Sequence, residues 1–149
     1  MSCPACGSPV VAFHVPPELR GHAPADEAAI CSRCLDVVAA SDVDESGLPS
    51  ANETQSDEAG VDDVSAPEDA DFSAINESFP SGRGGVAFAL ALGKLDSLAL
   101  NRAAIEELCE AAERAGTDVP LALERLAGAE GLDPPFDIER RSQQLASFR

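Results

Sequence analysis

Tryptophan and tyrosine are absent from this chain of 149 residues, and phenylalanine occurs only six times. We therefore expect a hydrophobic core built mainly from aliphatic side chains and alanine. The longest apolar run, residues 86–92, is far shorter than the roughly 20 residues that a membrane-spanning helix needs. The sequence also lacks the basic and apolar N-terminal regions of a secretory signal. These absences lead us to expect a soluble, cytoplasmic protein.

Histidine is scarce as well, with only His14 and His22 in the chain, and this limits the catalytic chemistry that the sequence supports. A Ser-His-Asp hydrolase would need one of these residues, and the GxSxG pattern that often carries the nucleophile is missing. A phosphate-binding loop requires Gly-Lys followed by Ser or Thr, whereas Gly93-Lys94 is followed by Leu95. We therefore predict that the protein is not an enzyme.

Basic residues are few, and the formal net charge is −17, from 27 acidic and 10 basic residues. Lys94 is the only lysine. Such a composition is typical of proteins that work in concentrated salt, where the Debye length falls to about 3 Å at 1 M and self-repulsion is screened. The alternative is an ordinary acidic protein whose charge is concentrated in one segment.

Most of the excess charge does lie in one segment, residues 41–71, which contains eleven acidic residues and no basic residue. This segment shows no helical or strand periodicity, so we predict a disordered acidic linker. The alternative is an acidic arm that mimics nucleic acid or docks on a basic partner. We favour the simpler interpretation of a solvated spacer.

The clearest chemical motif consists of two cysteine pairs, Cys3-Pro4-Ala5-Cys6 and Cys31-Ser32-Arg33-Cys34. Two intervening residues allow one tight turn, here called a knuckle, to present both sulfur atoms to one metal ion, and two knuckles form a tetrahedral zinc site. The 24 residues between the pairs, 7–30, exceed the usual spacing of roughly 15–20. Because sulfur would fill all four positions, we expect structural rather than catalytic zinc. The predicted metal ligands are Cys3, Cys6, Cys31 and Cys34.

Other interpretations of the cysteines and histidines are weaker. A thioredoxin-like redox pair lies between a strand and a helix, and only two residues precede Cys3. A disulfide framework needs an oxidising compartment, and we see no export signal. Four cysteines already saturate the ion, so we expect His14 in a strand and His22 in a loop. Cys109, the fifth cysteine, is predicted to be a small buried residue on a helix rather than a nucleophile.

The sequence around the cysteine pairs predicts a zinc ribbon over residues 1–40, in which the metal holds a few short antiparallel strands together. Residues 9–15 favour a strand, and shorter apolar segments enter and leave the second pair at 28–30 and 35–38. So small a unit buries too little apolar surface to fold alone. Metal binding would supply the missing free energy.

Residues 72–149 have helical periodicity and predict a compact bundle. We expect 81–85 to form a turn and the rest to form five helices, at about 72–79, 86–99, 101–116, 117–127 and 136–148. The predicted fold class is a small α+β protein in two parts. It combines an N-terminal β zinc ribbon, a disordered acidic linker and a C-terminal all-α helical bundle.

A zinc ribbon that binds nucleic acid would need clustered basic residues to contact phosphates. The chain offers a modest set for this role, consisting of Arg20, Arg33, Arg140 and Arg141. We therefore predict a non-enzymatic adaptor that binds another protein in a high-salt cytoplasm. A nucleic-acid-binding regulator is the alternative.

Three segments of the chain also resemble a known family, the small haloarchaeal zinc-ribbon proteins of an uncharacterised family. The resemblance is carried by MSCPACGSPVVAFHVP, ICSRCLDVV and ALALGKLDSLALNRAAIEEL, of which the LDSLALNR stretch is the most specific part. It supports the salt-adapted, two-part interpretation and implies that the four paired cysteines bind the metal. It implies no activity, because none is established for the family.

Overall fold

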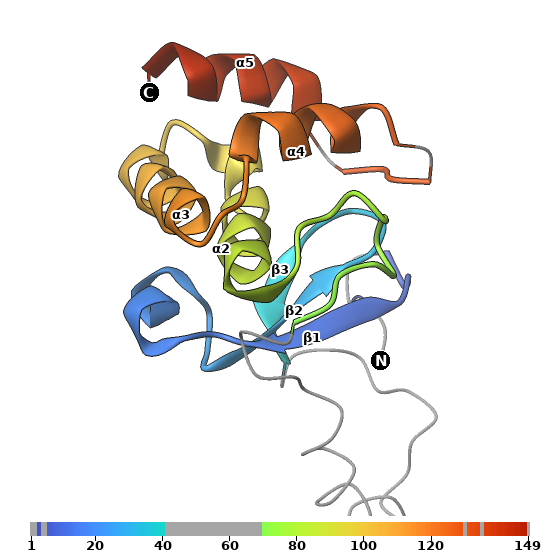
Figure 1. Cartoon of the computed structure of the whole chain (residues 1–149). Coiled ribbons are helices and arrows are strands. Elements are labelled where there is room, and N and C mark those ends of the chain that lie inside the picture. Colours follow the sequence, from blue (N-terminus) through green and yellow to red (C-terminus); the bar gives the residue numbers. More distant parts are fainter. Residues whose placement is uncertain (1–2, 4–5, 41–69, 130, 135, 149) are drawn as a thin grey trace, which may run out of the picture.

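The computed structural model describes residues 3, 6–40, 70–129, 131–134 and 136–148. In this part of the chain a small antiparallel sheet carries helices on one face, and further helices lie beyond them (Figure 1). The predicted α+β layout, with an N-terminal sheet and C-terminal helices, is confirmed. Residues 41–69, which make up almost all of the predicted linker, lie outside the described residues. No helix within the described ranges is long and apolar enough to cross a membrane.

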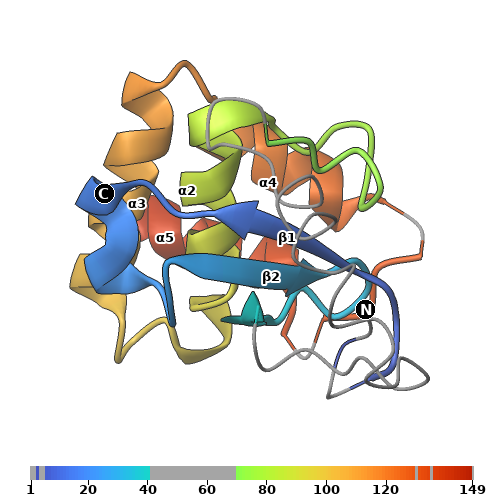
Figure 2. The same ribbon diagram turned by 90° about the horizontal axis from the view of Figure 1, so that it is seen from below.

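The N-terminal sheet has three strands in the order β1-β2-β3, and both neighbouring pairs are antiparallel (Figure 2). Its strands are β1 (Val10–His14), β2 (Glu27–Cys31) and β3 (Val37–Ala39). The connection between β1 and β2 contains a short 3₁₀ helix, η1 (Pro17–His22). His14 is thus a strand residue, and His22 lies in a connection between strands, as predicted.

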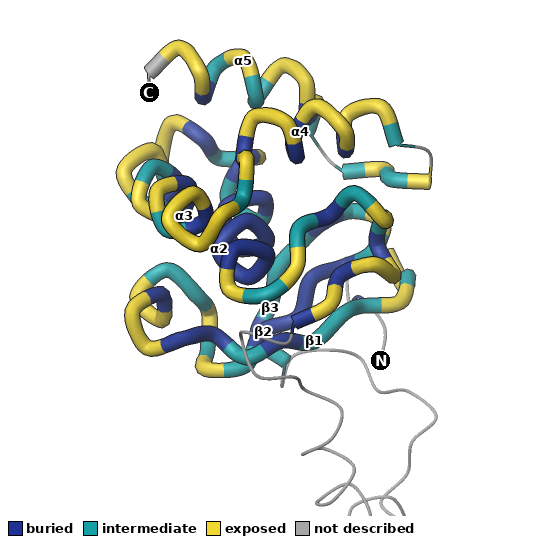
Figure 3. The backbone as a smooth tube through the Cα atoms, viewed as in Figure 1, coloured by how far each residue is buried: buried dark blue, intermediate teal, exposed yellow. Residues whose placement is uncertain are grey.

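The C-terminal part contains four α-helices and a short 3₁₀ helix among its described residues. They are α2 (Gly82–Leu92), η5 (Leu95–Ser97), α3 (Arg102–Arg114), α4 (Val119–Ala127) and α5 (Ile138–Phe148). α2 is the central helix and is buried from Gly84 to Leu92 (Figure 3). It packs against α3 and β3, while α5 packs against α4. The longest apolar run of the sequence, residues 86–92, therefore lies in the buried helix.

The predicted helix over 72–79 is wrong, because these residues form successive turns. Two local hydrogen bonds account for the difference. The Asp71 side chain accepts from the Ser73 N–H at 2.9 Å, and the Asn76 side chain accepts from the Ser78 N–H at 2.8 Å. Side-chain acceptors of this kind compete with the backbone pattern of a helix. The large apolar residues of the segment are nevertheless buried.

α2 begins and ends earlier than its predicted span of 86–99. The glycine-rich segment before the apolar run, expected to form a turn, is the first turn of this helix. A Cβ atom at Gly84 would collide with the Thr117 side chain. A Cβ atom at Gly85 would collide with the Pro80 carbonyl group. These glycines therefore allow the helix to approach its neighbours closely, which a local pattern does not reveal.

The starts of the last two helices are set by aspartate side chains. Asp118 precedes α4, and its carboxylate accepts from the Leu121 N–H at 3.2 Å. Asp137 precedes α5, and its carboxylate accepts from the Arg140 N–H at 3.1 Å. These bonds satisfy N–H groups that lack a partner in the first turn of a helix, so both helices begin about two residues later than predicted.

The sheet and the helices share one hydrophobic core, which a row of phenylalanine rings crosses. The ring centroids of Phe13 in β1 and Phe72 are 5.4 Å apart. Those of Phe72 and Phe79 are 4.9 Å apart, and those of Phe79 and Phe88 in α2 are 5.2 Å apart. Ala70, placed in the linker by the sequence prediction, is buried in the same core. The two parts of the chain are therefore packed on each other.

Polar contacts join the same two parts at the surface. Arg83 of α2 donates to a carboxylate oxygen of Glu18 in η1 at 2.9 Å. His22 Nε2 lies 2.6 Å from a carboxylate oxygen of Glu107 in α3. Exposed pairs of this kind each contribute roughly 0–1 kcal/mol to stability, so the shared core dominates the association.

Candidate metal centre

The first cysteine pair is followed by a tight turn at Gly7. The Gly7 N–H donates to the Cys3 carbonyl at 2.8 Å, and the Cys3 N–H donates to the Ser8 carbonyl at 2.8 Å. Gly7 has a φ of +78°, a left-handed conformation that glycine adopts without the steric cost of a Cβ atom. The glycine therefore allows the chain to turn back from the first pair into β1.

The second cysteine pair begins where β2 ends, at Cys31. The Cys31 N–H donates to the Asp36 carbonyl at 2.9 Å, which closes the turn between β2 and β3. The N–H groups of Arg33 and Cys34 both donate to the Cys31 sulfur, each at 3.3 Å. Leu35 then takes a left-handed φ of +61°. The backbone of this knuckle thus holds the Cys31 sulfur in a fixed orientation.

The register of the strands brings the two pairs together. Val10, which follows the first knuckle, lies opposite Cys31 across β1 and β2. Ser32 donates twice to the Pro9 carbonyl, from its N–H at 3.0 Å and from its hydroxyl at 2.7 Å. Pairs that are separated by 24 residues in the sequence therefore meet at one end of the sheet.

The four predicted ligands form one compact cluster, in which all the sulfur atoms lie within 4.8 Å of one another. The Cys3 and Cys34 sulfur atoms are 3.7 Å apart. Those of Cys6 and Cys31 are 3.3 Å apart. A tetrahedral ion with metal–sulfur bonds of about 2.3 Å places its ligand atoms about 3.8 Å from one another. The cluster therefore has dimensions that could hold a metal ion.

Most of the cysteine cluster is buried, but one of its four residues is accessible to solvent. Cys3 and Cys31 are 3% and 0% exposed. Cys34 is half-buried, and Cys6 is exposed. Solvent and dissolved reagents therefore reach the cluster first at Cys6.

The surroundings of the thiols change their acidity in different directions. Burial raises the pKa of Cys31 and of Cys34. The pKa of Cys6 is lowered to about 6, because the side chain and backbone of Ser8 form hydrogen bonds with its sulfur. Metal ligands must be thiolates, so a cation entering the cluster has to displace protons from Cys31 and Cys34.

The sequence does not single out three residues that shape this cluster, namely Ser8, Leu35 and Asp133. The Asp133 N–H donates to the Arg33 carbonyl at 2.7 Å, which joins the second knuckle to the segment between α4 and α5. That contact joins distant parts of the chain and has no local signal. Leu35 directly follows the second pair as Gly7 follows the first, but leucine gives no local signal of a left-handed conformation.

The four arginines considered for nucleic-acid binding lie on three different elements. Arg20 belongs to η1 and pairs with Asp26 at 3.4 Å. Arg33 is exposed in the second knuckle. Arg140 and Arg141 lie on α5. These residues are thus not gathered on one helix face or strand.

The remaining cysteine and the histidines are separate from the sulfur cluster. Cys109 is 1% exposed on α3, so its predicted burial is confirmed. His22 contacts Glu107, and His14 is the last residue of β1. The group of candidate metal ligands found among the described residues contains neither histidine.

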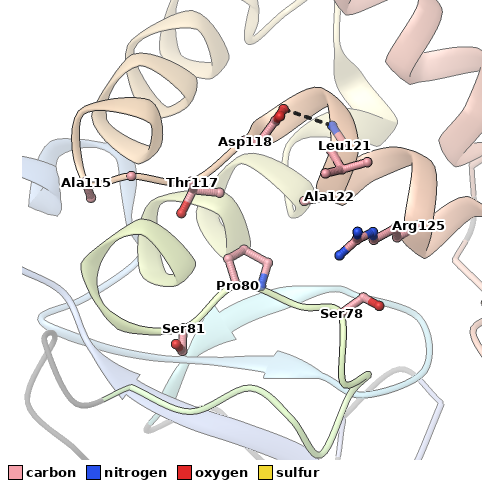
Figure 4. A pocket seen from close by; sticks show the side chains of 10 residues that line it. Ser78, Pro80, Ser81, Ala115, Thr117, Asp118, Leu121, Ala122 and Arg125 are labelled. Carbon is pink, nitrogen blue, oxygen red and sulfur yellow. Dashed lines mark hydrogen bonds between the residues drawn. The ribbon is translucent and has the colours of Figure 1, made fainter.

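The described residues also form a shallow cavity of about 330 Å³ at the start of α4 (Figure 4). Ser78 and Pro80 line one side of it, and Thr117, Leu121 and Arg125 line the other. None of the four clustered cysteines contributes to this lining. The cavity is therefore distinct from the candidate metal centre, and its mixed lining does not define a ligand.

Comparison with known families gives one result. The model of the Family of unknown function (DUF6276) matches residues 2–149, and the chain therefore belongs to this family. Neither a curated protein nor a solved structure matches the chain. The family match includes both cysteine pairs and every helix of the described residues.

Proposed function

For this member of DUF6276, we propose a zinc-binding, non-enzymatic adaptor in which the metal is structural. The zinc assignment rests on one observation, the cluster of four cysteine sulfur atoms within 4.8 Å of one another. Zinc favours four ligands in a tetrahedron and binds thiolate sulfur well. The proposed ligands are Cys3, Cys6, Cys31 and Cys34.

A structural role follows from the number of sulfur ligands. Catalytic zinc keeps one coordination position for water or substrate, whereas four cysteines fill all positions of a tetrahedral ion. Cys3 and Cys31 are buried, which also restricts access of a substrate to such an ion. The expected contribution of the metal is therefore to hold the two knuckles together.

Zinc at this position would stabilise more than the sheet. Cys6 lies before β1, Cys31 ends β2, and Cys34 lies before β3, so the ion would fix the ends of all three strands. The second knuckle is also bonded through the Arg33 carbonyl to the Asp133 N–H, which lies between α4 and α5 in the helical part. Because the sheet and the helices share one core, metal binding is coupled to the folding of both.

A protein partner is the interaction that the surface supports best. Leu100 is 88% exposed just before α3, and Leu121 is 40% exposed on α4. Contact with another protein would remove these large apolar side chains from water. Nucleic acid is the less favoured partner, because a chain with a net charge of −17 is repelled by phosphates and Arg20 is engaged by Asp26.

The acidic composition supports function in a cytoplasm of high salt concentration. Residues 41–71 carry eleven of the 27 acidic residues and no base. Repulsion among so many carboxylates is screened at high ionic strength. We therefore place the adaptor in a salt-rich cell.

Metal analysis of the purified full chain tests the zinc assignment. We expect one zinc ion per chain, and a loss of most of it in Cys31→Ser, because this variant removes a buried ligand and the acceptor of two backbone N–H groups. Cys109→Ser is the matched control, since Cys109 is buried outside the cluster, and should retain the zinc. Equal zinc contents in Cys31→Ser and the unaltered chain would contradict the ligand set.

Capture of the tagged protein from its native high-salt lysate tests the adaptor role. After crosslinking, we expect the same protein partner with and without nuclease treatment, and its loss in Leu100→Ser. Recovery that depends on intact nucleic acid would favour the alternative regulator. Failure to recover any reproducible partner would contradict the adaptor proposal.

A further inference from the structure

We propose that Cys6 is a site of oxidative modification, with Cys31 as its resolving thiol. The oxidant is hydrogen peroxide or a related hydroperoxide, and the product is a metal-free centre with two disulfides. This inference rests on the proposed zinc site and adds a second chemical state of the same four cysteines. It is carried by the exposure of the cysteine residues and by the distances between their sulfur atoms.

Exposure determines which cysteine meets an oxidant first. Cys6 is exposed, whereas Cys3 and Cys31 are 3% and 0% exposed. The backbone N–H groups of Arg33 and Cys34 also donate hydrogen bonds to the Cys31 sulfur and so cover it further. A small oxidant that arrives from solvent therefore reacts at Cys6.

Distance determines the partner of Cys6. Four cysteines allow three pairings. The Cys6 and Cys31 sulfur atoms are 3.3 Å apart, and those of Cys3 and Cys34 are 3.7 Å apart. Since a disulfide bond is about 2.05 Å long, each of these pairs has to close by only about 1–2 Å. These two short distances favour the pairing of Cys6 with Cys31 and of Cys3 with Cys34, in which each disulfide joins the first knuckle to the second.

The reaction balances with one peroxide for each disulfide. The Cys6 thiolate attacks a peroxide oxygen, the O–O bond breaks, hydroxide leaves, and Cys6 becomes a sulfenic acid. The Cys31 thiolate then attacks the Cys6 sulfur, forming the S–S bond while the S–O bond breaks and a second hydroxide leaves. Two electrons pass from the sulfur pair to the peroxide. A second peroxide oxidises Cys34 and Cys3 in the same way, after which the four sulfur atoms offer no thiolate to a metal ion.

The predicted disulfides would join the same strand ends as the metal does. Cys6 lies before β1, Cys31 ends β2, and Val10 of β1 is already opposite Cys31 in the sheet. The oxidised chain therefore keeps its sheet while it loses its metal. This distinguishes a reversible second state from oxidative unfolding.

Peroxide treatment of the zinc-loaded full chain tests this inference. We expect release of all bound zinc to a chromogenic chelator, an intact mass that shows two disulfides, an unchanged circular dichroism spectrum, and rebinding of zinc after addition of a thiol reductant. Brief treatment in the presence of dimedone should label Cys6 in preference to Cys31. Cys109→Ser is the control and should release zinc in the same way.

Peptide mapping identifies the pairing. Trypsin cleaves after Arg20 and Arg33, so that Cys31 and Cys34 fall on separate peptides while Cys3 and Cys6 remain together. Fragmentation of the linked peptides between Cys3 and Cys6 then distinguishes the three pairings. We expect Cys6 joined to Cys31 and Cys3 joined to Cys34.

The possible outcomes separate this inference from the proposal on which it rests. Zinc that stays bound in excess peroxide, disulfides within each knuckle, or first labelling at Cys31 would overturn the inference and leave the zinc site in place. A chain that binds no zinc before treatment would overturn the zinc assignment and the inference together.

Discussion

Leu35 adopts at the second knuckle the left-handed conformation that Gly7 adopts at the first, with φ values of +61° and +78°. Each residue directly follows a cysteine pair. The Leu35 side chain is completely buried. The steric cost of a left-handed leucine, roughly 1–2 kcal/mol, is comparable to the roughly 1.5–3 kcal/mol gained by burying its side chain. The second knuckle therefore places a core residue where the first has a glycine.

Leu35→Gly should destabilise the zinc-loaded protein by about 1–3 kcal/mol without removing the metal. The substitution relieves the backbone strain but deletes a buried leucine side chain, which costs roughly 2–5 kcal/mol in other cores. Because tryptophan and tyrosine are absent, urea unfolding is best followed by circular dichroism. A urea midpoint at or above that of the unaltered chain would show that the backbone strain at Leu35 costs more free energy than burial of its side chain gains.

Gly7→Ala is the counterpart at the first knuckle and should destabilise the chain by roughly 1–2 kcal/mol, because alanine is strained at this φ. Gly21→Ala is its control: neither position has an atom within 4 Å of the added Cβ, and Gly21 is not left-handed. Equal effects of the two substitutions would contradict a conformational role for Gly7.

Gly93→Ala should separate the end of α2 from the sheet. A Cβ atom at Gly93 would lie 2.6 Å from a methyl carbon of Val37 in β3. Overpacking of this kind costs roughly 1–3 kcal/mol. Adding Val37→Gly, which removes both this methyl carbon and the Val37 Cβ atom that would lie 2.7 Å away, should recover part of the loss, which a double-mutant cycle measures. If the two substitutions change the free energy of unfolding by strictly additive amounts, direct packing of the helix on the sheet is contradicted.

Phe72→Ala should weaken both parts of the molecule at once. Phe72 lies between Phe13 of β1 and Phe79 in the shared core, and truncation of a buried phenylalanine costs roughly 3–5 kcal/mol. Loss of helical signal and release of zinc should occur at the same, lower urea concentration. Two separate transitions would instead show that the sheet and the helices unfold independently.

Salt should stabilise the protein by screening its negative charge. The urea midpoint is expected to rise as sodium chloride is increased toward the molar range, where the Debye length is about 3 Å. Neutralising the acidic residues of 41–71 with Asn and Gln should reduce this dependence. A midpoint that does not respond to salt would contradict the salt-adapted interpretation.

The candidate metal ligands could be predicted from the sequence because metal binding restricts both the residue type and the spacing. Two CxxC pairs identify the four cysteines, and the flanking β-prone segments predict the strands that carry them. The conformation of Leu35 could not be predicted in this way, because leucine rarely takes a positive φ. Asp133 could not be predicted because its contact with Arg33 depends on the packed fold.

In the helical part, too, some features can be predicted from the sequence and others depend on the packed fold. The continuous apolar run predicts the buried α2, since only a helix in the core is apolar on nearly every side. Residues 72–79 have an equally suggestive spacing of apolar residues, but Asp71 and Asn76 bond to nearby N–H groups and form turns instead. The contact of Phe13 with Phe72, which joins the two parts, lies beyond any local pattern.

X-ray absorption on the metal of the purified chain tests the central claim most directly. The energy of the absorption edge identifies the element, and the extended fine structure of the spectrum reports the type of the ligand atoms and their distances from the metal. We predict zinc surrounded by four sulfur atoms at about 2.3 Å, with the same shell in Cys109→Ser. Another element, or a shell that contains nitrogen or oxygen, would contradict the structural four-cysteine zinc site.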